Sequence, residues 1–301
     1  MTQSGQPQSA TEHWTIRKLL RWAAEDFERR GIESPRLEAE LLLGHALGMP
    51  RIQMIVQSAN VPSTSELGRF RDLVRRRRTS EPTAYLLGQK EFYGLLFKID
   101  RRVLVPRPDT ETLVEVALER TRPRSVYGQA LDLCTGSGCV AIAFAKHRPT
   151  WFVTGVDISA DALMVAEENA LRLGNILSLA WVNSDLFAAL PAQRFELITA
   201  NPPYIPTSVC EGLDSTVRDF EPRLALEGGA DGLDVIRRLV HDAPERLEPN
   251  GILASEIAND QAAIVTDLFA KRGFVEVNCR KDYGGRDRVV SGRWPESSNQ
   301  R

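Results

Sequence analysis

The chain is poor in the residues that mark disulfide-rich and metal-binding proteins. It contains 4 cysteines and 4 histidines among 301 residues. The cysteines are Cys134, Cys139, Cys210 and Cys279, and none belongs to a C-x-x-C pair or stands beside histidines at zinc spacing. This pattern predicts reduced, structural thiols in the cytoplasm and no metal site.

Long apolar runs and an excess of one charge are missing too. No apolar run reaches the length of a transmembrane helix, and residues 1–14 lack the basic and apolar regions of a signal peptide. The net charge is −2, so global charge gives no sign of a protein that coats nucleic acid. We therefore expect a cytoplasmic monomer with neither a membrane partner nor a stable nucleic-acid partner.

What is present falls into two regions of different pattern. A polar tail, residues 1–12, is expected to be disordered. After it, apolar residues recur at helical spacing, and no strand pattern is visible up to residue 78. Ser63 and Glu66 stand at capping-box spacing before one of these helices. The pattern predicts a small all-α domain over residues 13–88.

Six arginines lie between Arg69 and Arg78, at the end of that helix. Cations at a helix C-terminus are stabilised by the helix dipole, so the cluster is interpreted first as a solvated helix end. The alternative is a patch that contacts RNA or an acidic partner.

Residues 89–108 predict a β-hairpin that links the two regions. Phe97, Ile99, Val103 and Val105 alternate around a turn expected at Asp100-Arg101.

From about residue 130, strand patterns alternate with helical patterns. The expected strands are 130–134, 152–157, 178–183, 195–200 and 251–256, and the expected helices are 139–147, 160–173, 232–247 and 260–272. This alternation predicts a parallel sheet covered by helices. Two last strands, 274–280 and 287–294, are joined by a link too short for a parallel pair. The fold class is therefore α/β, with a Rossmann-like doubly wound sheet of seven strands and a reversed terminal strand, over residues 109–295.

The first strand runs into the glycine turn DLCTGSGC, residues 132–139. Glycines at a strand-to-helix turn allow a ligand to approach the backbone. Asp157 ends the next strand and suits the ribose hydroxyls of an adenosine, while Asp185 and Leu186 follow the third strand. NAD is the rival cofactor, but no second mononucleotide half is visible. The acidic residues and apolar slot favour S-adenosylmethionine, which is a cation without a pyrophosphate.

The strand FELITA is followed by NPPY, residues 201–204. Two prolines cannot continue a hydrogen-bonded strand, so it ends at about Ala200. The bland interpretation is that Asn201 caps a turn. Because NPPY follows a glycine turn and Asp157, we favour a functional role, in which an amide carbonyl and a ring bind a planar group.

In this order, DLCTGSGC, Asp157 and NPPY resemble the class I S-adenosylmethionine-dependent methyltransferases that act on planar nitrogens of adenine, cytosine or glutamine. Further stretches are similar to the protein-(glutamine-N5) methyltransferases of peptide chain release factors, the HemK or PrmC family. They are SPRLEAELLLGHALG, EPTAYLLGQKEFYGLLFKIDRRVLVPRPDTETLVE, EPRLALEGGADGLDVIRRL and YGGRDRVV. The resemblance covers residues from about 14 to 292.

This resemblance implies methylation of the glutamine in the Gly-Gly-Gln motif of class 1 release factors, in support of translation termination. It implies that the helical domain grips the release factor. The Asn201 side chain and the Pro202 carbonyl would accept the two amide N–H groups, with Pro203 stiffening the turn and Tyr204 packing on the substrate. The implied cofactor contacts are Cys134, Thr135, Gly136, Ser137, Gly138, Asp157, Ile158, Asp185, Leu186 and Asn201. Further possible contacts are Phe92, Arg107 and Thr110.

Two departures and three alternatives stay open. Relatives often have glycine in place of Cys134, and some place a tryptophan where this chain has Leu186. A sister group methylates a ribosomal-protein glutamine, but departs from the RPDTE sequence that is intact here at 107–111. The remaining alternatives are an adenine methyltransferase of nucleic acid and a non-enzymatic binding module. Residues 221–234 form a long loop that we expect to wall the substrate pocket.

Overall fold

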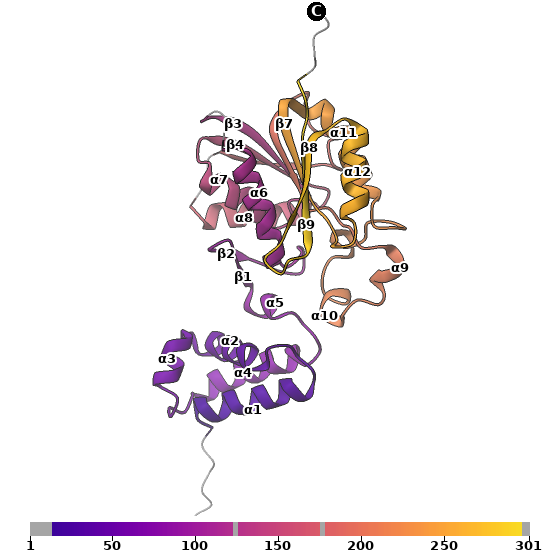
Figure 1. Ribbon diagram of the computed structural model, residues 1–301. Helices are drawn as coiled ribbons and strands as arrows, with labels where there is room; N and C mark the ends of the chain where they lie inside the picture. Colours follow the sequence, from indigo (N-terminus) through magenta and orange to yellow (C-terminus); the bar gives the residue numbers. More distant parts are fainter. Residues whose placement is uncertain (1–13, 123–125, 175–177, 297–301) are drawn as a thin grey trace, which may run out of the picture. The chain divides into compact units, whose positions relative to one another are not determined.

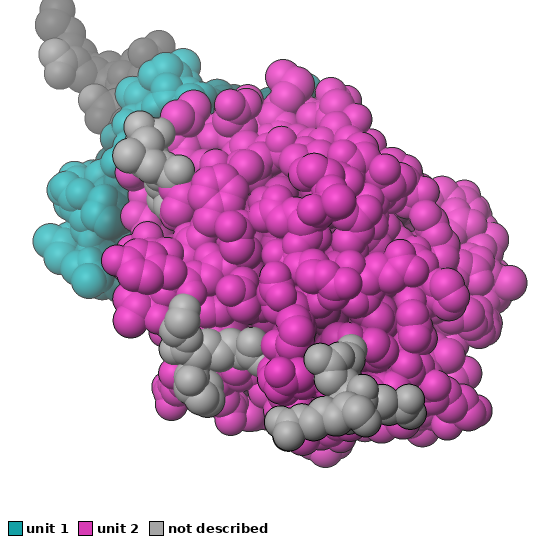
Figure 2. Space-filling view, turned by 90° about the horizontal axis from the view of Figure 1, so that it is seen from above, with its two compact units in different colours: residues 1–87 teal, residues 88–301 magenta. Residues whose placement is uncertain are grey.

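The structure is a computed structural model that describes residues 14–122, 126–174 and 178–296. It divides into two compact units, residues 1–87 and 88–301, which are coloured separately in Figure 2. The predicted disordered tail, residues 1–12, lies outside the described residues.

The first unit is entirely helical in its described part. Apolar side chains of its helices, including Phe27, Leu42 and Phe70, are buried together in one core. The predicted capping box is present, because Ser63 N–H donates to Glu66 Oε2 at 2.6 Å and Glu66 N–H donates to Ser63 Oγ at 3.3 Å. The helices are α1 (Ile16–Arg29), α2 (Pro35–Leu47), α3 (Arg51–Val56), α4 (Thr64–Arg77) and α5 (Thr83–Leu87).

Most of the arginine cluster has partners within this unit. Arg69 donates to the Ala46 carbonyl at 2.8 Å. Four more arginines pair with carboxylates: Arg75 with Asp72, Arg76 with Glu81, Arg77 with Glu38, and Arg78 with Asp26. Five of the six arginines thus bind groups of this unit, whereas the sequence indicated a solvated helix end.

The hairpin is present, but its predicted turn is wrong. Strands β1 (Gln89–Phe92) and β2 (Leu95–Lys98) are joined at Tyr93-Gly94, not at Asp100-Arg101. Tyr93 and Gly94 have φ values of 51° and 73°, and two successive left-handed residues match the twist of a hairpin. Asp100 does begin a turn, in which Val103 N–H donates to its carbonyl at 3.1 Å, but no strand follows among the described residues before β3.

The second unit confirms the predicted α/β fold. Its sheet has seven strands in the order β5-β4-β3-β6-β7-β9-β8, and β9 runs antiparallel to both of its neighbours. The strands are β3 (Gly128–Leu133), β4 (Trp151–Asp157), β5 (Leu179–Asn183), β6 (Phe195–Ala200), β7 (Leu247–Glu256), β8 (Val275–Lys281) and β9 (Asp287–Arg293).

Helices cover both faces of this sheet (Figure 1). One face carries α6 (Glu111–Arg120), α7 (Cys139–His147) and α8 (Ala160–Arg172), and the other carries α11 (Asp234–Arg246) and α12 (Ala262–Arg272). Shorter elements are η1 (Pro108–Thr110), α9 (Thr207–Cys210), α10 (Ser215–Arg218) and η2 (Arg223–Ala225). The apolar cores on either side of the strands hold the sheet rigid under the loops at its edge.

The strand order reverses between β3 and β6. From β3 the chain continues to β4 and β5 on one side, whereas β6 and β7 lie on the other. Leu133 at the end of β3 pairs in register with Ala200 at the end of β6. The next residues, Cys134 and Asn201, therefore begin neighbouring loops at the carboxyl edge, where open α/β sheets bind ligands.

Candidate active site

A cavity of about 270 Å³ opens at this carboxyl edge of the sheet unit. It collects most of the residues that the sequence singled out. Those that line it are Arg107, Thr110, Cys134, Thr135, Gly136, Ser137, Asp157, Ile158, Asp185, Leu186, Asn201 and Pro203. The remaining four, Phe92, Gly138, Pro202 and Tyr204, lie outside the lining.

The glycine turn is shaped by left-handed backbone. Gly136 and Gly138 have φ values of 54° and 76°, and the Gly138 N–H donates to the Thr135 carbonyl at 2.8 Å. A Cβ on Gly138 would stand 3.0 Å from the Ala166 Cβ and from the Trp181 ring, whereas one on Gly136 would meet nothing within 4 Å. Gly138 thus serves close helix–strand packing, and Gly136 faces the cavity.

Asp157 is bound into the same turn by main-chain groups. Its Oδ2 accepts the Gly136 N–H at 2.8 Å, and its Oδ1 accepts the Ser159 N–H at 2.9 Å. Burial raises the pKa of this carboxyl, against the opposing effect of those N–H groups. Each carboxylate oxygen can accept more than one hydrogen bond, so the group keeps acceptor capacity beyond its main-chain donors.

Asp132 lies beneath the turn and also lines the cavity. It accepts the Thr135 hydroxyl at 2.6 Å and the Thr199 hydroxyl at 2.7 Å. Burial raises its pKa to about 6. The sequence interpretation quoted this residue within DLCTGSGC without assigning it a role, although an acidic residue inside a buried strand is the signal that would have marked it.

Asn201 leaves the end of β6 and reaches the cavity with its side chain half-buried. Its Nδ2 donates to Thr110 Oγ1 at 3.4 Å, across 91 residues of sequence. No described residue donates to its Oδ1. The amide nitrogen of Asn201 is thus bound to Thr110, whereas its oxygen has no donor among the described residues and can accept one from a ligand.

Half-buried Tyr204, which ends the NPPY sequence, pairs with the buried Glu256. The Tyr204 hydroxyl donates to Glu256 Oε1 at 3.1 Å, and Glu256 is 1% exposed. Burial raises the pKa of Glu256 to about 7, against the effects of the Thr110 hydroxyl and the Arg288 charge. Burial also raises the pKa of Tyr204. Glu256 was not predicted as a site residue, although it ends the apolar strand GILASE as Asp157 ends its own.

The opposite wall is built by two loops. The segment 102–107 lines the cavity together with Pro222, Leu224 and Ala225 of the long loop, which agrees with the expectation for that loop. Arg107 closes the wall with an ion pair to buried Glu221 at 2.7 Å, and burial raises the pKa of that glutamate.

Two further residues show the limits of motif reading. Phe92 is 1% exposed and packs edge-on against Phe97, with ring centroids 6.1 Å apart, so it lies in the hairpin core. Arg238 was not predicted, but it lines the cavity and pairs with Asp185 at 2.8 Å. It comes from α11, and no local pattern connects it with the third strand.

Within the part of the chain that the structure describes, no helix combines the length and the apolar surface that a membrane span needs. No group of three or more histidine, cysteine, aspartate or glutamate side chains is arranged to hold a metal ion in the same residues.

Comparison with known proteins identifies close relatives. Two family models match, the PrmC N-terminal domain over residues 18–88 and the methyltransferase small domain over residues 109–212. The release factor glutamine methyltransferase of Geobacter sulfurreducens is 45% identical over 282 residues, which cover 94% of this chain and 98% of that protein. The protein of the same name from Rhodopirellula baltica is 42% identical over 285 residues, covering 92% and 96%.

The solved structures agree on the fold. A methyltransferase from Pyrococcus furiosus superposes with a TM-score of 0.50 at 19% identity, over 68% of this chain and 92% of its own.

Proposed function

The chain belongs to the family of release factor glutamine methyltransferases, and from this we propose its substrate and cofactor. It transfers a methyl group from S-adenosylmethionine to the side-chain amide nitrogen of the Gly-Gly-Gln glutamine of a class 1 peptide chain release factor. The observation that carries the proposal is that Asn201, the glycine turn and Asp157 line one cavity.

The residues around the turn fit S-adenosylmethionine. Asp157 keeps acceptor capacity beyond its main-chain donors, which suits ribose hydroxyls. Ile158 and Leu186 offer apolar contact to the adenine ring. Asp132 and Asp157 line the same cavity, and two carboxyl groups there favour a cationic ligand once they are ionised.

Asn201 addresses the difficulty of the chemistry, which is the weak nucleophilicity of an amide nitrogen. Its Oδ1 accepts one N–H of the substrate amide. The family resemblance assigns the other N–H to the Pro202 carbonyl, although Pro202 does not line the cavity. Together they fix the amide plane and stabilise positive charge that develops on nitrogen. S-adenosylmethionine supplies the methyl group: the nitrogen–carbon bond forms as the sulfur–carbon bond breaks, and one proton leaves the nitrogen to water.

The helical unit is the proposed recognition element for the folded release factor. The match of residues 18–88 to the PrmC N-terminal domain supports this assignment.

The test is mass spectrometry of a purified bacterial class 1 release factor after incubation with the enzyme and S-adenosylmethionine. We expect one added methyl group on the Gly-Gly-Gln glutamine. Asn201→Ala should slow transfer roughly 100-fold, since it removes an acceptor that acts on the developing charge. Its affinity for S-adenosylhomocysteine should stay within about threefold of the wild type, because the ribose and main-chain contacts remain.

Asn278→Ala, in β8 at the far edge of the sheet, is the matched control and should leave the rate unchanged. An unmodified release factor, with cofactor binding intact, would contradict the proposed substrate and direct the next assays to a ribosomal-protein glutamine and then to adenine.

A further inference from the structure

Asn169 is a polar residue on the buried face of α8. The face is otherwise apolar, with Ala162, Val165 and Ala166 at helical spacing before it. The side chain is fully buried, at 0% exposure. A buried amide is unfavourable unless its donors and acceptor are paired, so its contacts indicate what it does.

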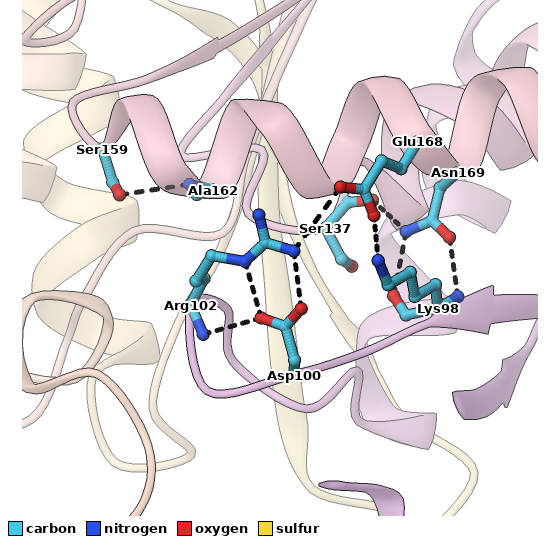
Figure 3. Close-up of polar contacts among 8 residues, drawn as sticks. All are labelled: Lys98, Asp100, Arg102, Ser137, Ser159, Ala162, Glu168 and Asn169. Carbon is cyan, nitrogen blue, oxygen red and sulfur yellow. Dashed lines mark hydrogen bonds and ion pairs between the residues drawn. The ribbon is translucent and has the colours of Figure 1, made fainter. Parts of the chain in front are cut away.

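All polar atoms of this amide bind main-chain groups of two other segments (Figure 3). Oδ1 accepts the Lys98 N–H at 2.6 Å, and Nδ2 donates to the Lys98 carbonyl at 3.0 Å. Nδ2 also donates to the Ser137 carbonyl at 3.0 Å. The opposite orientation of the amide would set Oδ1 against two carbonyl oxygens, so the partners define the orientation.

The two segments serve different parts of the cavity. Ser137 belongs to the glycine turn, at the proposed cofactor end. Lys98 ends β2, and the chain from there leads within a few residues into the segment 102–107 that walls the cavity. Asn169 is thus hydrogen-bonded to both the turn and the strand that precedes the wall.

Neighbouring ion pairs do not account for this attachment. Glu168 pairs with the Lys98 ammonium and lies 3.6 Å from Arg102, which itself bonds to Asp100 at 2.6 Å (Figure 3). The Lys98 and Glu168 side chains are 41% and 39% exposed, and ion pairs this open to solvent contribute little. The buried amide therefore carries most of the connection.

We propose that Asn169 is a positioning residue that couples the glycine turn to the hairpin and, through it, to the wall 102–107. The inference rests on the proposed function, because it takes the turn to be the cofactor site. Ligand binding at the turn should then stabilise the end of β2, although no hairpin residue needs to contact the ligand.

Hydrogen exchange of the wild-type protein tests the coupling without any substitution. S-adenosylhomocysteine is the probe, and its binding is measured separately by calorimetry. We expect the ligand to slow exchange in peptides covering residues 95–102 as well as in those covering 135–139. Slowing at 135–139 alone would overturn the coupling while leaving the proposed cofactor site in place. Absence of binding would overturn the proposed function, and the inference with it.

Substitutions then test whether Asn169 carries the coupling. Asn169→Asp keeps an acceptor for the Lys98 N–H but places oxygen against two carbonyls, and Asn169→Ala is used if that variant does not fold. For either variant, we expect the dissociation constant of S-adenosylhomocysteine to rise at least about tenfold, and exchange at 95–102 to stop responding to ligand.

The matched control is Glu168→Gln, one residue away, which removes the exposed ion pairs and should change the dissociation constant less than about twofold. A folded Asn169→Ala protein with wild-type affinity and wild-type protection of the hairpin would overturn the assignment.

Discussion

The two ends of the cavity are held in place by different parts of the chain. At the glycine turn, main-chain N–H groups of Gly136 and Ser159 bind the side chain of Asp157, and two hydroxyls bind Asp132 beneath it. At the NPPY end, side chains bind other side chains: Asn201 donates to Thr110, and Tyr204 donates to Glu256. The first end thus relies on main-chain donors to hold Asp157, whereas the contacts at the second end join polar side chains.

This difference determines where each end is sensitive to substitution. Main-chain groups keep their positions as long as φ and ψ are maintained, so the turn depends on glycines and on the acceptor that they bind. A side-chain network loses its geometry when one partner is removed, because the other is left buried and unpaired. The two ends should therefore respond to different kinds of change.

The largest effect is expected from Asp157→Ala at the cofactor end. Loss of charged acceptors for two hydroxyls should weaken binding of S-adenosylhomocysteine roughly 100- to 1000-fold, measured by calorimetry. Asp267→Ala is the control, since that carboxylate lies in α12 outside the cavity lining, where it pairs with Lys271 at 2.7 Å. If Asn201→Ala weakened binding as much as Asp157→Ala, the division between the two ends would be wrong.

The pH dependence of the free energy of unfolding tests the NPPY end, because Glu256 is buried there. The folded state raises the pKa of Glu256 to about 7 from its ordinary value of 4.5. A raised pKa means that the folded state holds the proton more tightly, so its stabilising contribution is present below about pH 4.5 and is lost as pH rises through 7. The groups that face it are Tyr204, Arg288 and Asp109.

Glu256→Gln should remove this dependence. Between pH 5 and pH 8, the free energy of unfolding of the wild type should fall by about 2–3 kcal/mol more than that of the variant. Urea titration of the full chain, followed by a signal from the sheet unit, measures the difference. Asp132→Asn gives a similar comparison at the other end, where the stabilising contribution is lost as pH rises through about 6. Parallel pH profiles for wild type and Glu256→Gln would show that this carboxyl does not titrate as described.

The fold was predictable because its strands are apolar and because nearby prolines and glycines mark where its strands and helices begin and end. The expected bounds 195–200 and 139–147 agree with β6 and α7, since prolines end the first and a glycine begins the second. The hairpin turn was misplaced because Asp100 is a familiar turn residue, whereas Tyr93-Gly94 lacks an Asn or Asp to signal its left-handed backbone.

The site was predictable only where motif and geometry coincide. Asp157 ends β4 and Asn201 follows β6, and both strands pair in parallel with β3, so the sheet itself brings the two residues to one edge. Glu256 lies 52 residues from its partner Tyr204, and Asn169 lies 71 residues from Lys98. Such contacts are created by tertiary packing, and a single sequence carries no spacing rule for them.

Substitutions at two glycines test whether the turn depends on its left-handed backbone conformation. Gly138→Ala adds a Cβ in left-handed backbone and against Ala166 and Trp181, so it should lower the free energy of unfolding by about 2–3 kcal/mol. Gly136→Ala has the same backbone penalty without the steric conflict and should lower it by about 1 kcal/mol. Urea titration measures both, and equal losses would show that packing at Gly138 is relaxed.

The smallest expected effect is that of Cys134→Gly. Unlike the two glycine substitutions, it should raise the free energy of unfolding. This residue has φ of 56°, in the region where a side chain is unfavourable and glycine is not. Cys134→Gly should therefore relieve backbone strain worth about 1 kcal/mol, offset in part by the lost packing of a half-buried thiol. We expect a net gain of up to about 0.5 kcal/mol in urea titration, with cofactor affinity unchanged. A loss of stability would mean that the Cys134 side chain, rather than the main chain, holds the start of the turn, and the contrast between the two ends would then fail at its first residue.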